Sequence, residues 1–386
     1  METKKENLNI ITLGRSGVGK SSLLNYLLNK EHFKTGVGRP VTGAGFYDTQ
    51  HKIAGVPVTI IDSYGIESGS NFLEWKKLLQ AKLKQHDYSH SIEEWLHVVI
   101  YCISAEDARV EPIDWQIIKN FTSTGQKMII AITHADEGED TCKALRDEIC
   151  AKIPDIDEKY FVEIDSVRYK KQYFGNDLRN MIIEQYLDNV FFALPKHCIQ
   201  LALAEIDDFQ RNINYDIEHR EYGFLDVFWG NDSEHIEWLR DKCKEFHDTF
   251  THKTLPSIMR FAVKESMNLA QNLGTILDNA ITSVDGKKSF SIRNKFKCPS
   301  GSSQLWNDND PLIDKIGLSV CAVLFSIPVS IYVGIRELIS HDTLKEKLCE
   351  TSENYCNDLR KQIKKSETKF AKEFNSIKKA VLNSAE

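Results

Sequence analysis

The first half of the chain alternates short, mostly apolar runs with stretches that mix apolar and polar residues. The apolar runs lie at residues 9–13, 56–62, 97–104, 127–132 and 161–166. Each has the length of a buried β-strand, and leucines at one-face helical spacing follow the first run, at 23, 24, 27 and 28. Because strands joined by helices pair in parallel, the pattern predicts an α/β fold in three layers, with a mostly parallel sheet between helices.

From about residue 191 onward only helical spacing remains. A helix is predicted to begin at Pro195, whose missing N–H suits a first helical turn, and others are predicted at 238–250, 258–277 and 343–381. A chain of 386 residues exceeds one ordinary hydrophobic core. The sequence therefore predicts two domains, an α/β domain at 1–190 and an all-α helical C-terminal domain at 191–386.

An uncharged apolar segment, residues 316–335, lies between Lys315 and Arg336. As a helix it would measure about 30 Å, enough to span the hydrocarbon core of a bilayer. Pro328 would kink such a helix, and its small residues would let neighbouring helices pack closely. Two interpretations stay open: a buried helix or hairpin of the helical domain, or a segment that contacts or enters a membrane.

Composition restricts the class of protein. The formal net charge of −7 argues against general nucleic-acid binding. The 9 cysteines include no C-x-x-C pair, which fits reduced thiols in a cytosol. Residues 1–7 lack the apolar core of a secretory signal. We therefore expect a cytoplasmic location, with membrane association as the alternative that residues 316–335 raise.

The turn after the first apolar run has the spacing G-x-x-x-x-G-K-[ST] of a phosphate-binding loop. Glycines let the backbone curl so that successive N–H groups point at a polyphosphate, and the helix that follows adds its positive end. Lys20 would reach the β- and γ-phosphates, and the Ser21 hydroxyl would bind Mg²⁺. The predicted binding residues here are Gly14, Arg15, Ser16, Gly17, Val18, Gly19, Lys20, Ser21 and Ser22.

A second motif, D-x-x-G, ends the apolar run at 56–62. Asp62 stands at the predicted carboxyl end of a strand, where its carboxylate could hold Mg²⁺ through water. Gly65 could offer its N–H to a γ-phosphate and let the following loop hinge.

With these motifs, the first half of the chain resembles the translation-factor-related class of P-loop GTPases, closest to its Era-like and septin-like branch. The resemblance implies that Thr42 is the threonine that closes on Mg²⁺ and the γ-phosphate. Thr133, His134 and Asp136 resemble the guanine-specifying motif, with Asp136 accepting hydrogen bonds from the base. Ser166 occupies the position whose backbone N–H contacts the guanine oxygen, and a plain strand end is the alternative there. The implied catalytic residues are Lys20, Thr42 and Gly65, and the implied metal ligands are Ser21, Thr42 and Asp62.

Departures from the family pattern affect the expected mechanism. Ile66 stands where Ras-like proteins carry the glutamine that orients the attacking water, so we expect slow intrinsic hydrolysis. His134 replaces the usual lysine beside the base. Arg15 and Arg109 are each open to two interpretations, an arginine finger or an ordinary ion-pair residue.

The insert at 68–97 carries apolar residues at helical spacing, and core packing and a switch-dependent partner surface both account for it. The sequence predicts a Mg²⁺-dependent protein that binds GTP and hydrolyses it to GDP and phosphate, acting as a conformational switch. Self-association or a protein partner, through the helical domain, would complete its activity. One alternative is a nucleotide-binding module with little hydrolysis; another is a membrane-associated assembly GTPase, distantly similar in architecture to dynamin-like proteins.

Overall fold

In the computed structural model the chain forms two compact units. The described residues are 8–28, 31–33, 45–53, 56–63, 65, 72–165, 174–222, 232–266, 268 and 341–383. Of these, the first unit takes everything up to Ala193 together with 266, 268 and 381–383, and the second takes 194–222, 232–265 and 341–380.

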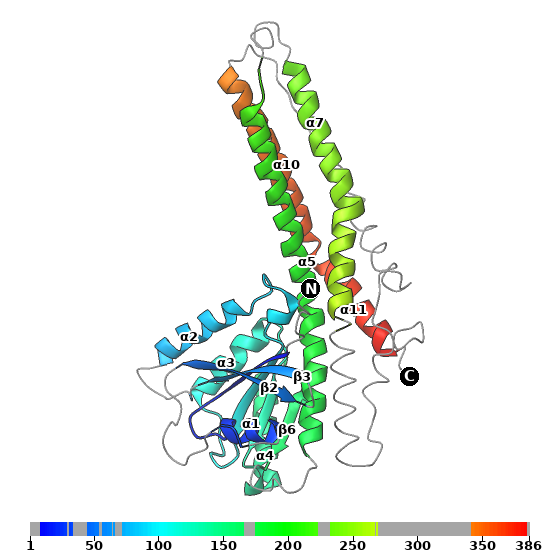
Figure 1. Cartoon of the computed structure of the whole chain (residues 1–386). Helices are drawn as coiled ribbons and strands as arrows, with labels where there is room; N and C mark the ends of the chain where they lie inside the picture. The colour runs from blue at the N-terminus through cyan, green and yellow to red at the C-terminus, as the bar shows by residue number, and fades with distance from the viewer. Residues whose placement is uncertain are drawn as a thin grey trace. The chain divides into compact units, whose positions relative to one another are not determined.

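The first unit is built on a six-stranded sheet with the order β2-β3-β1-β4-β5-β6 (Figure 1). The strands are β1 (Leu8–Gly14), β2 (Phe46–Ile53), β3 (Val56–Ser63), β4 (Val98–Ser104), β5 (Ile129–Thr133) and β6 (Phe161–Ile164). All neighbours pair in parallel except β2, which is antiparallel to β3. The predicted mostly parallel α/β sheet is confirmed.

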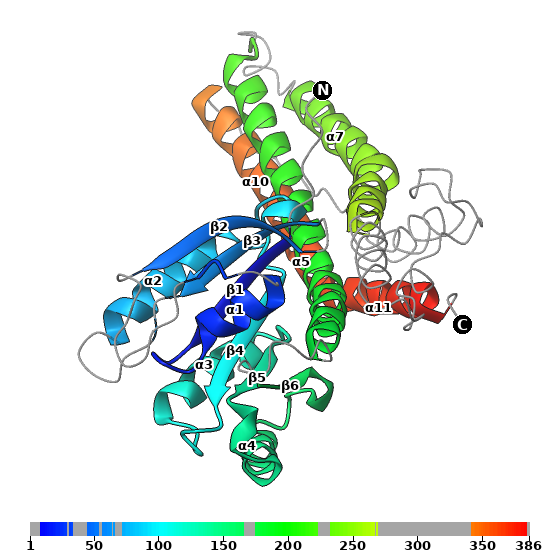
Figure 2. The same ribbon diagram turned by 60° about the horizontal axis from the view of Figure 1, so that its bottom comes forward.

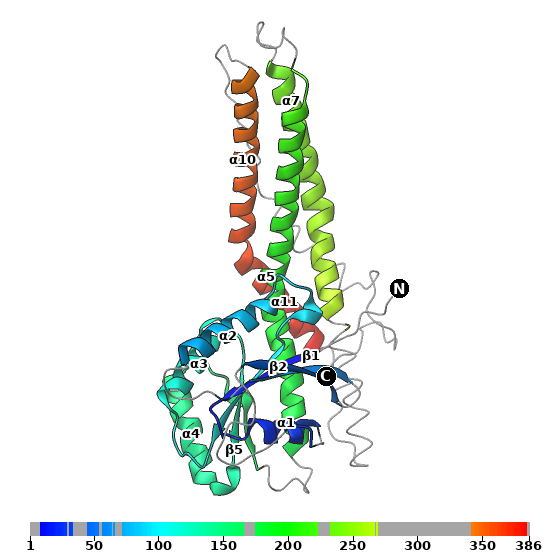
Figure 3. The same ribbon diagram turned by 60° about the vertical axis from the view of Figure 1, so that its left-hand side comes forward.

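Helices cover both faces of this sheet. One face packs against α2 (Phe72–Gln85), α3 (Pro112–Ser123) and α4 (Glu139–Lys152), whose apolar residues share one buried cluster with alternate residues of β1, β4 and β5. Figures 2 and 3 show these three helices on one side of the sheet and α1 (Lys20–Leu28) on the other. Short 3-10 turns lie at Ile92–Glu94, Ala135–Glu137 and Glu158–Tyr160.

Helix α5 (Phe174–His219) begins in the first unit, where two buried amides bind it to the sheet. Gln185 Nε2 donates to the carbonyls of Val99 (3.1 Å) and Lys127 (2.7 Å). Asn189 accepts from the Lys127 N–H at 2.8 Å and donates to the His97 carbonyl at 3.0 Å. These bonds attach α5 to backbone groups at and before the amino ends of β4 and β5.

The expected start of a new helix at Pro195 is wrong, because Pro195 lies inside α5. Proline removes one backbone donor from a helix interior, which costs stability. Buried neighbours on both sides, Leu194 and Cys198, supply packing that offsets the loss.

The second unit is helical, which confirms the predicted class of the C-terminal region. After α5 it contains α7 (Asp232–Thr249), a π-helical turn at Phe250–Thr254, α10 (His341–Lys365) and most of α11 (Glu367–Asn383). Helices α5, α7 and α10 lie side by side (Figures 1 and 3). Phe209 stacks on Phe246 with ring centroids 4.0 Å apart, and the Tyr355 hydroxyl donates to the Cys243 carbonyl at 3.0 Å.

Among the described residues, no helix is both long and apolar enough to cross a bilayer. The apolar segment 316–335 lies outside the described residues, so both interpretations of it stay predictions.

His97 links the start of β1 to the chain before β4. The Asn9 N–H donates to His97 Nδ1 at 3.0 Å, so the ring proton is on Nε2, which donates to the Ile92 carbonyl at 2.8 Å. The ring is buried, and this burial lowers the pKa of His97 from 6.5 to about 4, with a smaller contribution in the same direction from His86. The fold therefore requires the neutral imidazole.

We predict that His97 makes the stability of the fold sensitive to acid. Its folded-state pKa is below the unfolded value, so its contribution is complete above pH 6.5 and is lost as the pH falls from 6.5 through about 4. The loss is on the order of 3 kcal/mol. Urea denaturation at several pH values should show a shallower pH dependence in His97→Gln than in the unsubstituted protein. Equal dependence in both proteins would contradict the assignment.

Candidate functional site

The turn from β1 to α1 has the curled backbone expected of a phosphate-binding loop. Gly14, Gly17 and Gly19 all have positive φ, at 140°, 85° and 85°. A Cβ on Gly14 would lie 2.6 Å from the Cys102 carbonyl oxygen of the adjacent strand β4, so only glycine fits there. The first turn of α1 closes with the Leu23 N–H donating to the Gly19 carbonyl at 2.9 Å.

The side chain of Lys20 folds back over this loop. Its Nζ donates to the carbonyls of Gly14 at 3.0 Å and Arg15 at 2.6 Å. Burial lowers the pKa of Lys20, and the nearby Asp62 carboxylate works against that shift. The ammonium group therefore stands inside the loop, bound to backbone carbonyls of the loop itself.

Asp62 supplies the carboxylate on the other side of the loop, at the carboxyl end of β3. Its side chain is buried, and burial raises its pKa to about 6, an effect that Lys20 partly offsets. In the part of the chain that the structure describes, Asp62 Oδ1 has no hydrogen-bond partner. A buried carboxylate oxygen without a donor fits a hard cation such as Mg²⁺, which prefers oxygen ligands. Ser21, half-buried at the start of α1, is the described hydroxyl that would accompany it.

Gly65 lies directly against the phosphate-binding loop. A Cβ at this position would come 2.5 Å from the Ser16 Cα and 2.8 Å from the Ser16 nitrogen. The structure thus brings the two predicted motifs into contact, and no residue larger than glycine fits at 65 without moving the loop.

Residues of the predicted base motif lie beside the loop as well. Thr133, the last residue of β5, donates its hydroxyl to the Val18 carbonyl at 2.6 Å. His134 has a left-handed backbone with φ 54°, and its Nδ1 is 2.9 Å from the Ser104 hydroxyl. Asp136 follows in an exposed turn, where a ligand can reach its carboxylate.

The predicted arginines are both in ion pairs. Arg15 binds Asp107 at 2.5 Å and Asp114 at 3.2 Å, while the exposed Arg109 binds Glu111 at 2.6 Å. Sequence reasoning did not find Asp114, because its position in an amphipathic helix gives no sign of a contact 99 residues away. It also missed Ser104, whose place at the end of an apolar strand was the available signal.

The remaining predicted residues of the phosphate-binding loop differ in exposure. Val18 is buried within the loop, Ser16 and Gly17 are exposed, and Ser22 is half-buried in the first turn of α1. Thr42, Ser166 and Ile66 lie outside the described residues, so their roles stay predictions.

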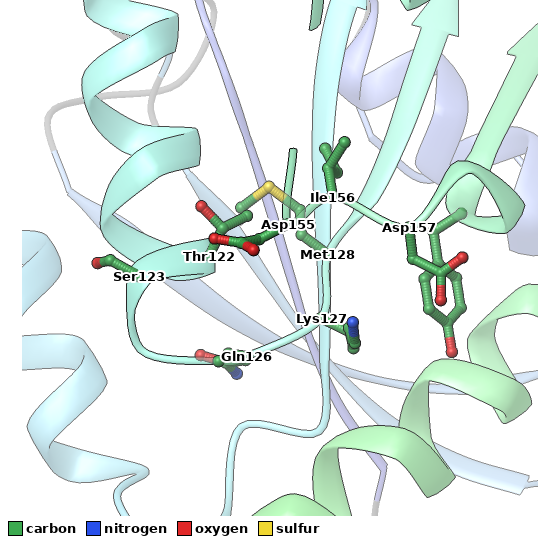
Figure 4. Close-up of a pocket in the computed structure, with 10 residues that line it drawn as sticks. Thr122, Ser123, Gln126, Lys127, Met128, Asp155, Ile156 and Asp157 are labelled. Atoms are coloured by element: carbon green, nitrogen blue, oxygen red, sulfur yellow. The ribbon is translucent and has the colours of Figure 1, made fainter. Parts of the chain in front are cut away.

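A pocket with a volume of about 360 Å³ opens elsewhere on the first unit (Figure 4). Its walls come from the end of α3, the residues that lead into β5 and the segment before β6, including Thr122, Lys127, Asp155 and Tyr160. This pocket is at the amino end of β5, whereas the phosphate-binding loop is at the carboxyl ends of the strands. It is therefore separate from the candidate site.

Comparison with known proteins agrees with the geometry of this site. The sequence family described as 50S ribosome-binding GTPase matches residues 9–134. A translocase of chloroplast 34 homologue from Chlamydomonas reinhardtii is 27% identical over 145 residues, which cover 34% of this chain and 36% of that relative's length.

Solved structures resemble part of the chain at low similarity. Era from Aquifex aeolicus has a TM-score of 0.34 at 22% identity, over 42% of this chain and 52% of that one. Toc33 from Arabidopsis thaliana has a TM-score of 0.35 at 17% identity, over 48% of this chain and 85% of that one. These structures carry no functional argument at such TM-scores, and the family match gives the coarser result, that residues 9–134 are similar to a GTPase domain.

Proposed function

We propose that the chain is a Mg²⁺-dependent GTP switch, with residues 1–190 as its GTP-binding domain and 191–386 as the helical domain that responds. The observation that carries the proposal is the curled loop around Lys20 beside a buried Asp62 oxygen that has no hydrogen-bond partner among the described residues. A cation inside the loop suits polyphosphate, and a free carboxylate oxygen beside it suits a divalent metal.

The proposed chemistry is attack of water on the γ-phosphate of GTP, giving GDP and phosphate. Lys20 would exchange its two backbone carbonyls for phosphate oxygens, and the loop N–H groups would bind the same phosphates. Ser21, Thr42 and Asp62 would hold Mg²⁺, which neutralises developing charge when bound. Gly65 would donate its N–H to the γ-phosphate, and its contact with Ser16 supports that position.

Guanine would bind beside Thr133, His134 and Asp136. The exposed Asp136 carboxylate can accept from the N1–H and 2-amino groups of guanine, and adenine lacks that donor pair. Ser104 holds the imidazole of His134 through Nδ1, which leaves the ring face to stack on the base. The Ser166 N–H would donate a hydrogen bond to the guanine oxygen.

Hydrolysis is proposed to be slow in an isolated molecule, because Ile66 supplies no group that could orient water. Association with a second copy or a protein partner, through the helical domain, would supply the group that orients the attacking water. Arg109 is 74% exposed and close in sequence to the Arg15 contacts, so it is the arginine better suited to act on another molecule. The protein would be cytoplasmic. In the alternative in which it is a membrane-associated assembly GTPase, residues 316–335 would contact the membrane.

We predict that Lys20→Ala weakens GTP binding by roughly 100-fold or more, because the variant loses a desolvated charge partner of the phosphates. Titration with a fluorescent GTP analogue and Mg²⁺ would measure the affinity of the variant for GTP. Lys152→Ala is the matched control, since that lysine is half-exposed and pairs with Glu148 on α4. Normal GTP affinity in Lys20→Ala would exclude the phosphate-binding assignment.

We predict that Asp136→Asn reduces the preference for GTP over xanthosine triphosphate by roughly 10-fold to 100-fold, because the amide presents a donor where the carboxylate accepted. Competition binding with both nucleotides measures the ratio. Asp140→Asn, an exposed acid on the adjoining helix, is the control. An unchanged ratio in Asp136→Asn would remove this residue from the base site.

GTP and ATP turnover, measured with Mg²⁺ over a wide range of protein concentrations, tests self-association. We predict GTP-specific turnover per molecule that rises with concentration, because a second copy completes the catalytic groups. Tight GTP binding with flat, near-zero turnover would favour the nucleotide-binding module or a switch that needs an activator. A preference for ATP would contradict the guanine assignment.

A further inference from the structure

Arg15, the second residue of the phosphate-binding loop, is held by two carboxylates from outside the loop. Its Nε is 3.2 Å from Asp114 Oδ2, and its terminal nitrogen is 2.5 Å from Asp107 Oδ2. Asp114 is fixed in turn, because it accepts from the Tyr101 hydroxyl at 2.6 Å and from the Glu111 N–H at 2.9 Å. We call Asp107, Arg15 and Asp114 the arginine clamp.

The clamp is well buried at one end. The Asp114 side chain is 1% exposed and that of Arg15 18%, whereas Asp107 is 39% exposed. Burial raises the pKa of Asp114, and the bonds from Tyr101, Glu111 and Arg15 oppose that rise. A buried carboxylate without a paired cation costs free energy of folding. The ion pair between the Arg15 guanidinium and Asp114 is therefore expected to persist.

The backbone of Arg15 is also where Lys20 is anchored. The Arg15 carbonyl accepts from Lys20 Nζ at 2.6 Å, and the next residue, Ser16, is the one that Gly65 contacts. A side chain fixed by two carboxylates fixes the peptide that carries it. The clamp therefore holds the residue whose carbonyl binds Lys20, in addition to the contacts that the sheet makes with the loop.

We infer that Arg15 is a positioning residue whose side chain orients the phosphate-binding loop and Lys20 through the arginine clamp, without touching phosphate itself. This inference depends on the proposed nucleotide function. It assigns a role in nucleotide binding to Asp107 and Asp114, which lie in and after the β4–α3 connection. Both carboxylates would repel a phosphate that they met directly, so they can support binding only through Arg15.

Nucleotide affinity in a set of full-length variants tests the clamp. Arg15→Ala, Asp114→Asn and the double variant are compared by titration with a fluorescent GDP analogue, with thermal unfolding recorded for each protein. We expect each single variant to bind about tenfold more weakly, and the double variant to be no weaker than either one, because all three break the same contact. Arg15→Lys should behave like Arg15→Ala, since lysine cannot span two carboxylates.

Direct phosphate contact by Arg15 gives a different result. Removing either carboxylate would then release the guanidinium, so Asp114→Asn and the more exposed Asp107→Asn would bind GDP equally well or more tightly, and Arg15→Lys would restore binding. Either result overturns the inference. A lower unfolding temperature with unchanged affinity in Arg15→Ala overturns it too, because the clamp would then serve the fold alone.

Asp107→Asn keeps the test valid if Asp114→Asn fails to fold, and we expect it to weaken GDP binding about twofold. Arg211→Ala, an exposed arginine of the second unit, is the control. Absence of GDP and GTP binding in the unsubstituted protein would overturn the proposed function together with this inference. Normal binding there with unchanged affinity in the clamp variants would overturn this inference alone.

Discussion

The close approach of the phosphate-binding loop to the neighbouring strands is the constraint on which the site depends. Strand β1 lies between β3 and β4, so the chain that leaves its carboxyl end must turn within the space those strands allow. The Cys102 carbonyl excludes any side chain at Gly14, and the Thr133 hydroxyl binds the Val18 carbonyl on the far side of the turn. Contacts with the sheet therefore hold the loop in its curled form.

Buried opposite charges follow from that geometry. The turn brings Lys20 near Asp62 in a region with little water, where each charge is costly unless it has partners. Lys20 finds two backbone carbonyls, but Asp62 Oδ1 finds no donor among the described residues. An anion for the lysine and a divalent cation for the aspartate would satisfy both groups at once, which is the combination that a metal-bound polyphosphate offers.

The sequence predicted those parts of the fold and site that short, local patterns determine. Continuous apolar runs indicated the parallel strands, and glycine spacing indicated the loop. Strand β2 was not predicted, because as an edge strand it alternates exposed and half-buried residues and has no apolar run. The path of α5 through Pro195 depends on tertiary packing that overrides a local signal. The clamp joins Arg15 to Asp114 across 99 positions, and no spacing rule reaches that far.

Three separate elements thus fix the loop from outside. Strand β5 holds it through Thr133, helix α3 holds it through Asp114 and Arg15, and Gly65, which follows β3, touches it. The first two are hydrogen-bonded and buried, whereas Gly65 makes only a close contact and belongs to a segment that continues toward α2. Among the described residues, the Gly65 attachment is thus the one without a hydrogen bond to the loop. In the proposed GTP switch, a phosphate that binds the Gly65 N–H would act on this attachment.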